Sequence, residues 1–306
     1  MPKAYVYTAN GGPEVEEFAD LPRPVPRPGQ LLVRVHAAGV NPADWKRRAG
    51  ARPPGTPAPE FPAVFGGEVA GVVEETGEGV EGFAAGSAVF GNPVTGGYAE
   101  YTLLPAELAA YKPPQVSFTD AATLPIAAAT AFDGIRQLAL PRGATLLIIG
   151  AGGGVGVAAA QIAARDGLHV LGTASTGKKA FLESLRVTHI KPGPGVEERI
   201  AAAAPGGVDA IFDLVGGTAL EEAASALEDR SKLISAADRE TVARLGGSPV
   251  ARARNRAVLD AVALMVATGS LRPMVTLTFP LDAAPEALRL VETGHARGKI
   301  VLEVGE

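Results

Sequence analysis

Residues 146–165 read LLIIGAGGGVGVAAAQIAAR. Five of the seven residues from Gly150 to Gly156 are glycines, and they lie between an aliphatic run and an alanine-rich segment. This order predicts a strand, a turn and a helix, which is the setting of a dinucleotide-binding loop. In such a loop the pyrophosphate contacts free backbone amides at the helix N-terminus, where the helix dipole favours negative charge. A tight strand-to-helix turn without a ligand is the alternative.

The glycine-rich loop matches the fingerprint G-x-G-x-x-G with one departure. The three fingerprint positions fall at Ala151, Gly153 and Gly156, so the first of them is alanine. Gly150 and Gly152 flank this alanine and add conformational freedom. The residues that we expect to bind the cofactor here are Ala151, Gly152, Gly153, Gly154, Val155 and Gly156.

The end of the next predicted strand, in HVLGTASTGKK (169–179), indicates which dinucleotide binds. Enzymes that prefer NAD carry Asp or Glu at this place, to hold the ribose 2′-hydroxyl. This chain has Ser175, Thr176, Lys178 and Lys179 there, and no carboxylate. Hydroxyl and ammonium groups suit a 2′-phosphate, so we predict NADPH as the cofactor. A serine that caps a helix, followed by two solvated lysines, is the alternative.

Outward from the loop, strands and helices alternate along the second half of the chain. ATLLIIG, HVLGTAS, VDAIFDLVGG and SKLISAA read as apolar strands, and the segments between them have helical character. This pattern is typical of a parallel sheet that is covered on both faces. The alanine-rich segment 120–140 is predicted to form one further helix.

The first part of the chain has a different texture. Residues 31–40, 68–77 and 87–91 are short β-branched runs, separated by stretches rich in proline and glycine. This favours a small β-barrel with irregular loops. The predicted fold class is therefore α/β, with a β-barrel domain beside a doubly wound parallel sheet.

Composition narrows the function. The 306 residues suffice for two domains, and net charge −5 argues against nucleic acid as a partner. The absence of cysteine excludes disulfides, thiolate nucleophiles and Cys-type zinc sites. The start MPKAYVYTANGG lacks the features of a signal peptide, and no apolar run reaches the length of a membrane span. We expect a cytoplasmic protein without a membrane partner.

With these elements in place, the chain resembles the medium-chain dehydrogenase/reductase superfamily, in its zinc-free branch of NADPH:quinone reductases like zeta-crystallin. The resemblance extends over nearly the whole sequence. It rests on AAGVNPADWKRRAG (37–50), FGGEVAGVVEETGEGVEGFAAGSAVFG (65–91), GGYAEY (96–101), AATLPIAAATAF (121–132), the glycine loop, GVDAIFDLVGG (207–217) and LRPMVTLTFPLDAAPEALRLVETGHARGKIVL (271–302).

The resemblance implies a domain organisation. Residues 1–117 would form a GroES-like catalytic domain, and 118–254 a Rossmann NADP-binding domain. Residues 255–306 would return to the catalytic domain. It also implies a homodimer, with the nicotinamide bound in the cleft between the domains.

The resemblance also bears on metal binding. Zinc-dependent relatives carry their ligands at the positions matched here by Asn41, Gly67 and Ile126. These residues cannot assemble the His and Cys set that catalytic zinc prefers. The four histidines, His36, His169, His189 and His295, are scattered without ligand spacing. We therefore predict a metal-free enzyme, and we expect Glu68 to serve the architecture of the barrel.

Without a metal, the chemistry left to this family is hydride donation from NADPH to a quinone or an α,β-unsaturated carbonyl. By resemblance, Asn41 would hydrogen-bond near the nicotinamide ribose or the acceptor. Thr130 would contact the nicotinamide side, and Asp44 would line the substrate side. Ordinary loop and helix roles are the alternatives for Asn41 and Thr130.

Further site residues follow from the same resemblance. Val215 and Gly216 would pass by the ribose, although an ordinary turn is the alternative there. Ser235, Ala236 and Ala237 would follow the end of the next strand. On the substrate side we expect Trp45, for which core packing is an equal alternative, and Lys46.

Two other functions stay open at this point. Enoyl-thioester reductases of the superfamily place a tyrosine proton donor in the segment matched by WKRRAGARPPGTPAPEFP (45–62), which has none. An enoyl reductase that tailors a polyketide or other natural product would need Lys46, another group or solvent as the acid. A non-catalytic NADPH-binding sensor or structural protein is the alternative from another class.

Overall fold

The aliphatic runs of the second half become the strands of a parallel sheet in the computed structural model, which describes residues 1–52, 55, 57–294 and 296–305. The chain divides into two compact units. Unit 1 comprises Met1–Ile126, Arg254–Ala267 and Val275–Glu306. Unit 2 comprises Ala127–Ala253 and Thr268–Met274.

The sheet of unit 2 has the strand order β11-β10-β9-β12-β13-β14, and every neighbouring pair is parallel. Numbered along the unit, this is the order 3-2-1-4-5-6, which reverses at β9. In such sheets ligands bind outside the carboxyl ends of the strands at the reversal point. The strands are β9 (Thr145–Ile149), β10 (His169–Thr173), β11 (Thr188–Ile190), β12 (Ala210–Asp213), β13 (Leu233–Ser235) and β14 (Ser248–Pro249).

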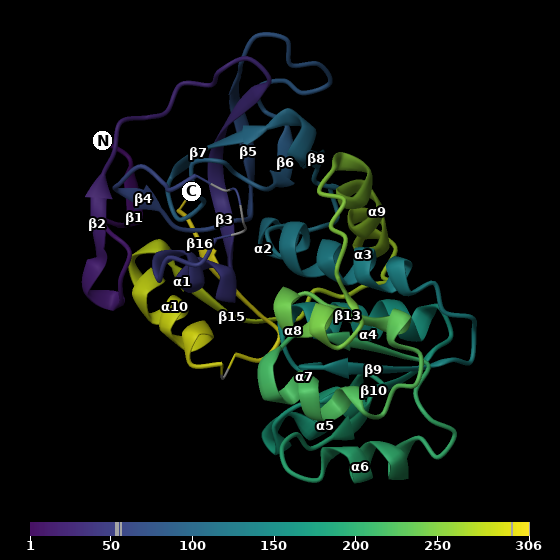
Figure 1. Cartoon of the computed structure of the whole chain (residues 1–306). Helices are drawn as coiled ribbons and strands as arrows, with labels where there is room; N and C mark the ends of the chain where they lie inside the picture. Colours follow the sequence, from purple (N-terminus) through teal and green to yellow (C-terminus); the bar gives the residue numbers. More distant parts are fainter. Residues whose placement is uncertain (53–54, 56, 295, 306) are drawn as a thin grey trace. The chain divides into compact units, whose positions relative to one another are not determined.

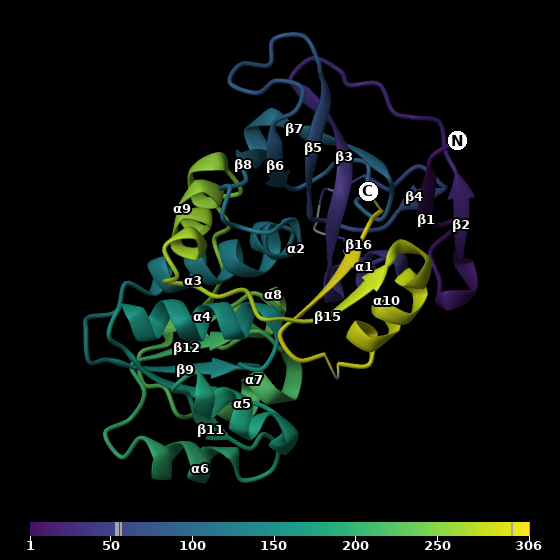
Figure 2. The same ribbon diagram turned by 180° about the vertical axis from the view of Figure 1, so that it is seen from behind.

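Helices cover both faces of this sheet. Residues of α6, α7 and α8 form one core with the strands, which includes Leu147, Ile211 and Leu220. α4 contacts β9 and β10, and it lies on the other side of the strands from α6 in both views (Figures 1 and 2). The helices of unit 2 are α3 (Ala129–Leu138), α4 (Gly154–Arg165), α5 (Lys179–Ser184), α6 (Val196–Ala203), α7 (Gly217–Ala224) and α8 (Arg239–Arg244).

The predicted single helix over 120–140 is divided in the structure. A short helix α2 (Phe118–Ala121) is followed by a π-helical turn at Leu124–Ala128 and then by α3. Pro125 explains the interruption, because it has no N–H to donate and its ring collides with the preceding turn of an α-helix.

Unit 1 is β-rich, as predicted. A seven-stranded sheet has the order β15-β16-β3-β5-β6-β8, with β7 also paired to β3, and a three-stranded sheet has the order β2-β1-β4. The strands are β1 (Lys3–Tyr7), β2 (Glu16–Asp20), β3 (Gln30–Val40), β4 (Ala63–Val64), β5 (Val69–Thr76), β6 (Ala88–Gly91), β7 (Tyr101–Pro105), β8 (Ala109–Tyr111), β15 (Val275–Pro280) and β16 (Lys299–Glu303).

The C-terminal segment completes this sheet, because β16 pairs antiparallel with β3 at Ile300↔Val40. The helices of unit 1 are α1 (Pro42–Arg48), α2, α9 (Arg256–Ala267) and α10 (Ala284–Glu292). Within the described residues, no helix is long and apolar enough to cross a membrane. The predicted α/β class, with a β-rich part and a doubly wound parallel sheet, is confirmed.

Candidate functional site

The glycine-rich loop joins β9 to α4, as predicted. Gly150 has a φ of 85°, in the left-handed region, and its N–H donates to Thr173 Oγ1 at 3.1 Å. A Cβ on Gly156 would lie 2.6 Å from Ala151 Cα, so this close approach requires glycine. Gly153 is the N-cap of α4 and makes no side-chain cap hydrogen bond. The first amides of α4 therefore remain available to an anion.

The polar residues after β10 lie beside this loop. A Cβ on Gly152 would come within 2.6 Å of Lys178 Cδ, so the side chain of Lys178 passes over the loop. Ser175 makes no helix-cap hydrogen bond and is exposed. Lys179 is also exposed, and it forms a surface ion pair with Glu183 at 3.8 Å. The structure thus brings the predicted 2′-phosphate residues to the same edge of the sheet as the loop.

Asp213, at the end of β12, organises the neighbouring strand ends and was not predicted from the sequence. Its carboxylate is fully buried. Oδ1 accepts the N–H groups of Val215 and Gly216, each at 3.0 Å, and Oδ2 accepts the hydroxyl of Ser235 at 2.6 Å. One buried carboxylate therefore holds two predicted cofactor-binding segments in place.

The side chain of Ser235 is occupied by this framework. Its Oγ also accepts the N–H of Ala237 at 3.1 Å, while Ala236 and Ala237 are exposed. Val215 is 54% exposed, and a Cβ on Gly150 would lie 2.8 Å from its Cγ2. The loops after β9 and β12 are therefore adjacent at the point where the strand order reverses.

Thr130, predicted to contact the nicotinamide side, lies at the start of α3, directly after the π-helical turn. Thr130 is 4% exposed. π-Helical turns are frequent at functional sites. The predicted role of Thr130 remains a proposal.

In unit 1, a buried ion pair gathers side chains from separate segments. Lys299 Nζ donates to Glu68 Oε1 and Asn41 Oδ1, both at 2.7 Å, and to the carbonyl of Val40 at 3.1 Å. Glu68 Oε2 accepts the N–H of Ile126 at 2.7 Å. Glu68 is fully buried and Lys299 is 5% exposed. These three contacts use all the protons of the ammonium group.

Asn41 is fixed by the same cluster. Its Nδ2 donates to the carbonyl of Gly39 at 3.2 Å and to Glu68 Oε1 at 2.8 Å. Both amide protons are therefore engaged within unit 1, and Oδ1 already accepts from Lys299. Toward a ligand, the Asn41 side chain therefore offers no donor.

Asp44 lies in the first turn of α1 and is 2% exposed. Its Oδ2 accepts the N–H of Asn41 at 2.8 Å and the hydroxyl of Tyr98 at 2.9 Å. Its Oδ1 is buried and has no hydrogen-bond partner among the described residues. Burial raises the pKa of Asp44 to about 6, against the opposing effects of the Asn41 hydrogen bond and the charge of Arg47. Burial also raises the pKa of Tyr98 well above its usual value, so Tyr98 stays protonated.

Trp45 and Lys46 follow Asp44 on α1. Trp45 is half-buried against the core of unit 1, and its Nε1 is buried without a hydrogen-bond partner among the described residues. Lys46 is exposed, with Nζ 5.7 Å from the centre of the Trp45 ring. Packing against the core and a place on the substrate side are both compatible with this position of Trp45.

The three positions that the family resemblance matches to zinc ligands come together in unit 1. Asn41 and Ile126 both bond to Glu68, and a Cβ on Gly67 would lie 3.2 Å from Ile126 Cδ1. They present an amide, a bare backbone and an alkyl group. In the described part of the chain, no three His, Asp or Glu side chains form a group that could hold a metal ion. His295 lies outside the described residues.

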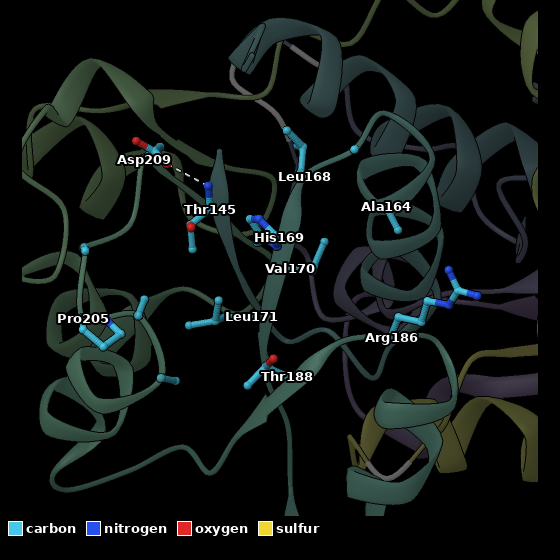
Figure 3. Close-up of a pocket in the computed structure, with 15 residues that line it drawn as sticks. Thr145, Ala164, Leu168, His169, Val170, Leu171, Arg186, Thr188, Pro205 and Asp209 are labelled. Carbon is cyan, nitrogen blue, oxygen red and sulfur yellow. Dashed lines mark hydrogen bonds between the residues drawn. The ribbon is translucent and has the colours of Figure 1, made fainter. Parts of the chain in front are cut away.

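A separate pocket lies at the opposite, amino-terminal edge of the parallel sheet (Figure 3). It has a volume of about 660 Å³ and includes Thr145, His169 and Asp209 in its lining. Asp209 accepts the N–H of Thr145 at 2.7 Å. None of the predicted site residues lines this pocket, which is therefore separate from the carboxyl edge with the glycine loop.

Comparison with known proteins identifies two family models on the chain. Residues 27–114 match the alcohol dehydrogenase GroES-like domain, and residues 194–302 match the zinc-binding dehydrogenase family. The first match gives the β-rich unit its predicted GroES-like character. The description of the second family names zinc binding, which is a property of that family and not an observation on this chain.

Individual relatives match over nearly the whole chain. Human quinone oxidoreductase is 31% identical, over 95% of this chain and 94% of the relative. An NADPH-dependent alkenal/one oxidoreductase of Arabidopsis thaliana is 30% identical, over 98% of this chain and 79% of the relative. The solved quinone oxidoreductase of Coxiella burnetii is 30% identical, with a TM-score of 0.89 and 99% of each chain covered.

Proposed function

Because the chain belongs to the medium-chain dehydrogenase/reductase superfamily, in its quinone oxidoreductase branch, we propose that it is a zinc-independent reductase that uses NADPH. Its acceptor is a quinone or an activated α,β-unsaturated carbonyl. The observation that carries this proposal is the glycine loop between β9 and α4, with Lys178 lying over it. The names of the relatives, which act on quinones and on alkenals or alkenones, supply the acceptor class.

The cofactor half of the proposal is supported by the form of the loop. Glycine at positions 152 and 156 lets Lys178 and the backbone of Ala151 approach closely, which keeps the loop tight, and the first amides of α4 have no capping side chain. These residues fit a pyrophosphate. Ser175, Lys178 and Lys179 would hold the 2′-phosphate, since none of them carries a negative charge. When bound, NADPH would supply the hydride.

The strand ends beside the loop would complete this half-site. We propose that Val215 and Gly216 contact the ribose, and that Ser235, Ala236 and Ala237 continue the same binding edge. The hydroxyl of Ser235 is engaged by Asp213, so Ser235 would contribute through its backbone. Thr130 would contact the nicotinamide side from α3.

The acceptor half is supported by residue chemistry in unit 1. Asn41, Gly67 and Ile126 offer no thiolate or imidazole, so the acceptor must already be electrophilic. With both amide protons engaged, Asn41 would accept a hydrogen bond, as from a ribose hydroxyl. Asp44, Trp45 and Lys46 would lie on the substrate side.

The proposal is tested with NADPH and NADH in parallel, against a quinone, an enone and an enoyl thioester, after treatment with a chelator. We expect NADPH oxidation with the quinone or the enone, and tighter binding of NADPH than of NADH. Tighter binding of NADH would contradict the cofactor assignment. A preference for the enoyl thioester would favour an enoyl reductase. Tight NADPH binding without oxidation by any acceptor would favour a non-catalytic binding protein.

We also propose that the protein is a homodimer, as the resemblance to the family implies. Size-exclusion chromatography with light scattering tests this directly. A mass of about twice the 31.1 kDa chain is expected, and a monomer would contradict the proposal.

A further inference from the structure

A cation without a recognisable sequence motif, Arg47, lies at one corner of unit 1. We define this Gly67 corner as Asn41, Asp44, Arg47, Gly67 and Ile126. A Cβ on Gly67 would come within 3.2 Å of Arg47 Nη1 and within 3.2 Å of Ile126 Cδ1. Arg47 follows Asp44 by three residues on α1, so the two side chains share one face of the helix. The guanidinium therefore lies at the backbone of Gly67.

Arg47 differs from its neighbour Arg48 in how its charge is used. Arg48 is 2% exposed and forms ion pairs with Glu16 and, at 2.7 Å, with Glu292. Arg47 is exposed, and none of the described residues forms a hydrogen bond or an ion pair with its side chain. Its guanidinium keeps its donors free for a ligand.

The charge of Arg47 acts on two titratable side chains near it. Arg47 lowers the pKa of Asp44 and of Tyr7, while burial, the larger effect, raises both. Lys299, a cation that contacts Asn41 of this corner, donates all three of its protons to Glu68, Asn41 and the Val40 carbonyl. Of these two cations, Arg47 is the one that can donate to an incoming group.

We propose that Arg47 binds the carbonyl oxygen of the acceptor and stabilises the negative charge that this oxygen gains during reduction. This inference rests on the proposed function and adds the group that polarises the acceptor. Neither a metal nor a tyrosine in segment 45–62 is then needed for that task. A planar guanidinium can donate two parallel hydrogen bonds to the two oxygens of a carboxylate, or two converging ones to a single oxygen, and it stays protonated throughout.

The chemical step balances for an enone. The β-carbon gains the hydride that NADPH supplies, and the π electrons of the C=C bond move to form the new C=C bond of an enolate. The electron pair of the C=O bond goes to the oxygen, where Arg47 donates hydrogen bonds without losing a proton. Water supplies the proton that the α-carbon then takes. The enone is reduced by two electrons, and NADPH is oxidised to NADP⁺.

The kinetic test compares Arg47→Met, Arg47→Lys and the control Arg27→Met. Arg27 is an exposed arginine of the same unit, so its replacement makes the same change in net charge. We expect Arg47→Met to lose on the order of 100-fold in kcat/KM with an enone, as for removal of one oxyanion donor. Arg47→Lys should lose less, and the Kd of NADPH should not change. Equal losses in Arg47→Met and Arg27→Met, or no loss in Arg47→Met, would overturn the proposal.

An equilibrium measurement separates this inference from the proposed function. 4-Nitrophenolate serves as a stable oxyanion probe, and the fluorescence of Trp45, the single tryptophan of the sequence, reports its binding. We expect binding to weaken at least about tenfold in Arg47→Met, which corresponds to one lost charge-assisted contact. Unchanged binding would contradict the role of Arg47. The two proposals can fail separately. If the wild-type protein oxidised no NADPH, the proposed function would be wrong; if Arg47→Met nevertheless bound 4-nitrophenolate more weakly than the wild type, the oxyanion site would still be supported.

Discussion

The glycine loop of unit 2 and the buried cluster of unit 1 are built from opposite materials. The loop consists of seven consecutive residues, 150–156, and presents backbone with almost no side chains. The cluster consists of the side chains of Asn41, Glu68 and Lys299, with two of these residues 258 positions apart. Ligand binding at a site made of backbone should be weakened by an added side-chain atom. The stability of a cluster of buried charges should be lowered by the removal of one charge.

The largest effect is expected from removing a charge in unit 1. Lys299→Met would leave the fully buried Glu68 carboxylate without its cation, which costs about 3–5 kcal/mol in the free energy of unfolding. Urea denaturation followed by the fluorescence of Trp45 reports on this unit. The double variant Lys299→Met/Glu68→Gln should recover much of the loss, because neither buried charge then remains.

The exposed ion pair between Lys3 and Asp282 is the control in the same unit. Surface ion pairs contribute little, so Lys3→Met should shift the denaturation midpoint only slightly. Equal shifts for Lys299→Met and Lys3→Met would show that the buried cluster does not depend on its charges.

A smaller effect on the free energy of unfolding is expected from Asp44, another buried carboxyl group of unit 1, and this effect depends on pH. The pKa of Asp44 is about 6 in the folded protein and 3.8 in its ordinary state, so the folded state binds more protons between these values. The free energy of unfolding therefore falls as pH rises through this window, by about 3 kcal/mol for this group. Asp44→Asn keeps the oxygen that accepts from Asn41 and Tyr98 but cannot ionise.

The difference in stability between Asp44→Asn and the wild type should accordingly rise in favour of the variant from pH 4 to above pH 6. Denaturation curves at several pH values measure this difference. The contributions of the other titrating groups are the same in both proteins and therefore cancel. A difference that stays constant with pH would mean that Asp44 titrates at its ordinary pKa.

In unit 2 the expected sensitivity is to an added atom. Gly156→Ala would place a Cβ 2.6 Å from Ala151 Cα, so the loop backbone would have to shift. A displacement of this kind typically costs about 1–3 kcal/mol, and we expect NADPH to bind about tenfold more weakly or worse. Isothermal titration calorimetry measures the change. Gly206→Ala, which meets nothing within 4 Å, should bind NADPH like the wild type.

The smallest effect on NADPH affinity is expected from Lys178, whose side chain lies over the glycine loop. Lys178→Met removes one charge beside the predicted 2′-phosphate position, and we expect a loss of about tenfold in NADPH affinity, equal to one charge-assisted contact. NADH, which lacks that phosphate, should bind as before. Losses of equal size for both dinucleotides would assign Lys178 to the pyrophosphate instead.

The same contrast explains how much could be predicted from the sequence. The α/β class, the family and the position of the glycine loop were predicted correctly, because consecutive residues carry that signal. The break at Pro125 within the predicted helix was missed, although proline carries a local reason for it. The roles of the individual site residues remain predictions.

Lys299 and Asp213 were not predicted, because their importance lies in contacts between distant segments. Lys299 reads as an ordinary strand start in KIVLEV, and Asp213 as the polar end of a buried strand. Only the pairing of β16 with β3, and of β12 with β13, brings them to their partners. Arg47 likewise reads as one of several basic residues until the fold sets it at Gly67.

Isotope transfer in chelator-treated protein follows the proposed hydride step itself. NADPH that carries deuterium on the transferred C4 position is incubated with an α,β-unsaturated ketone, and the product is analysed by mass spectrometry and NMR. We expect one deuterium on the β-carbon of the saturated ketone, at an undiminished rate without metal. A product without deuterium, or no reduction of any quinone or enone while NADPH stays bound, would contradict this expectation.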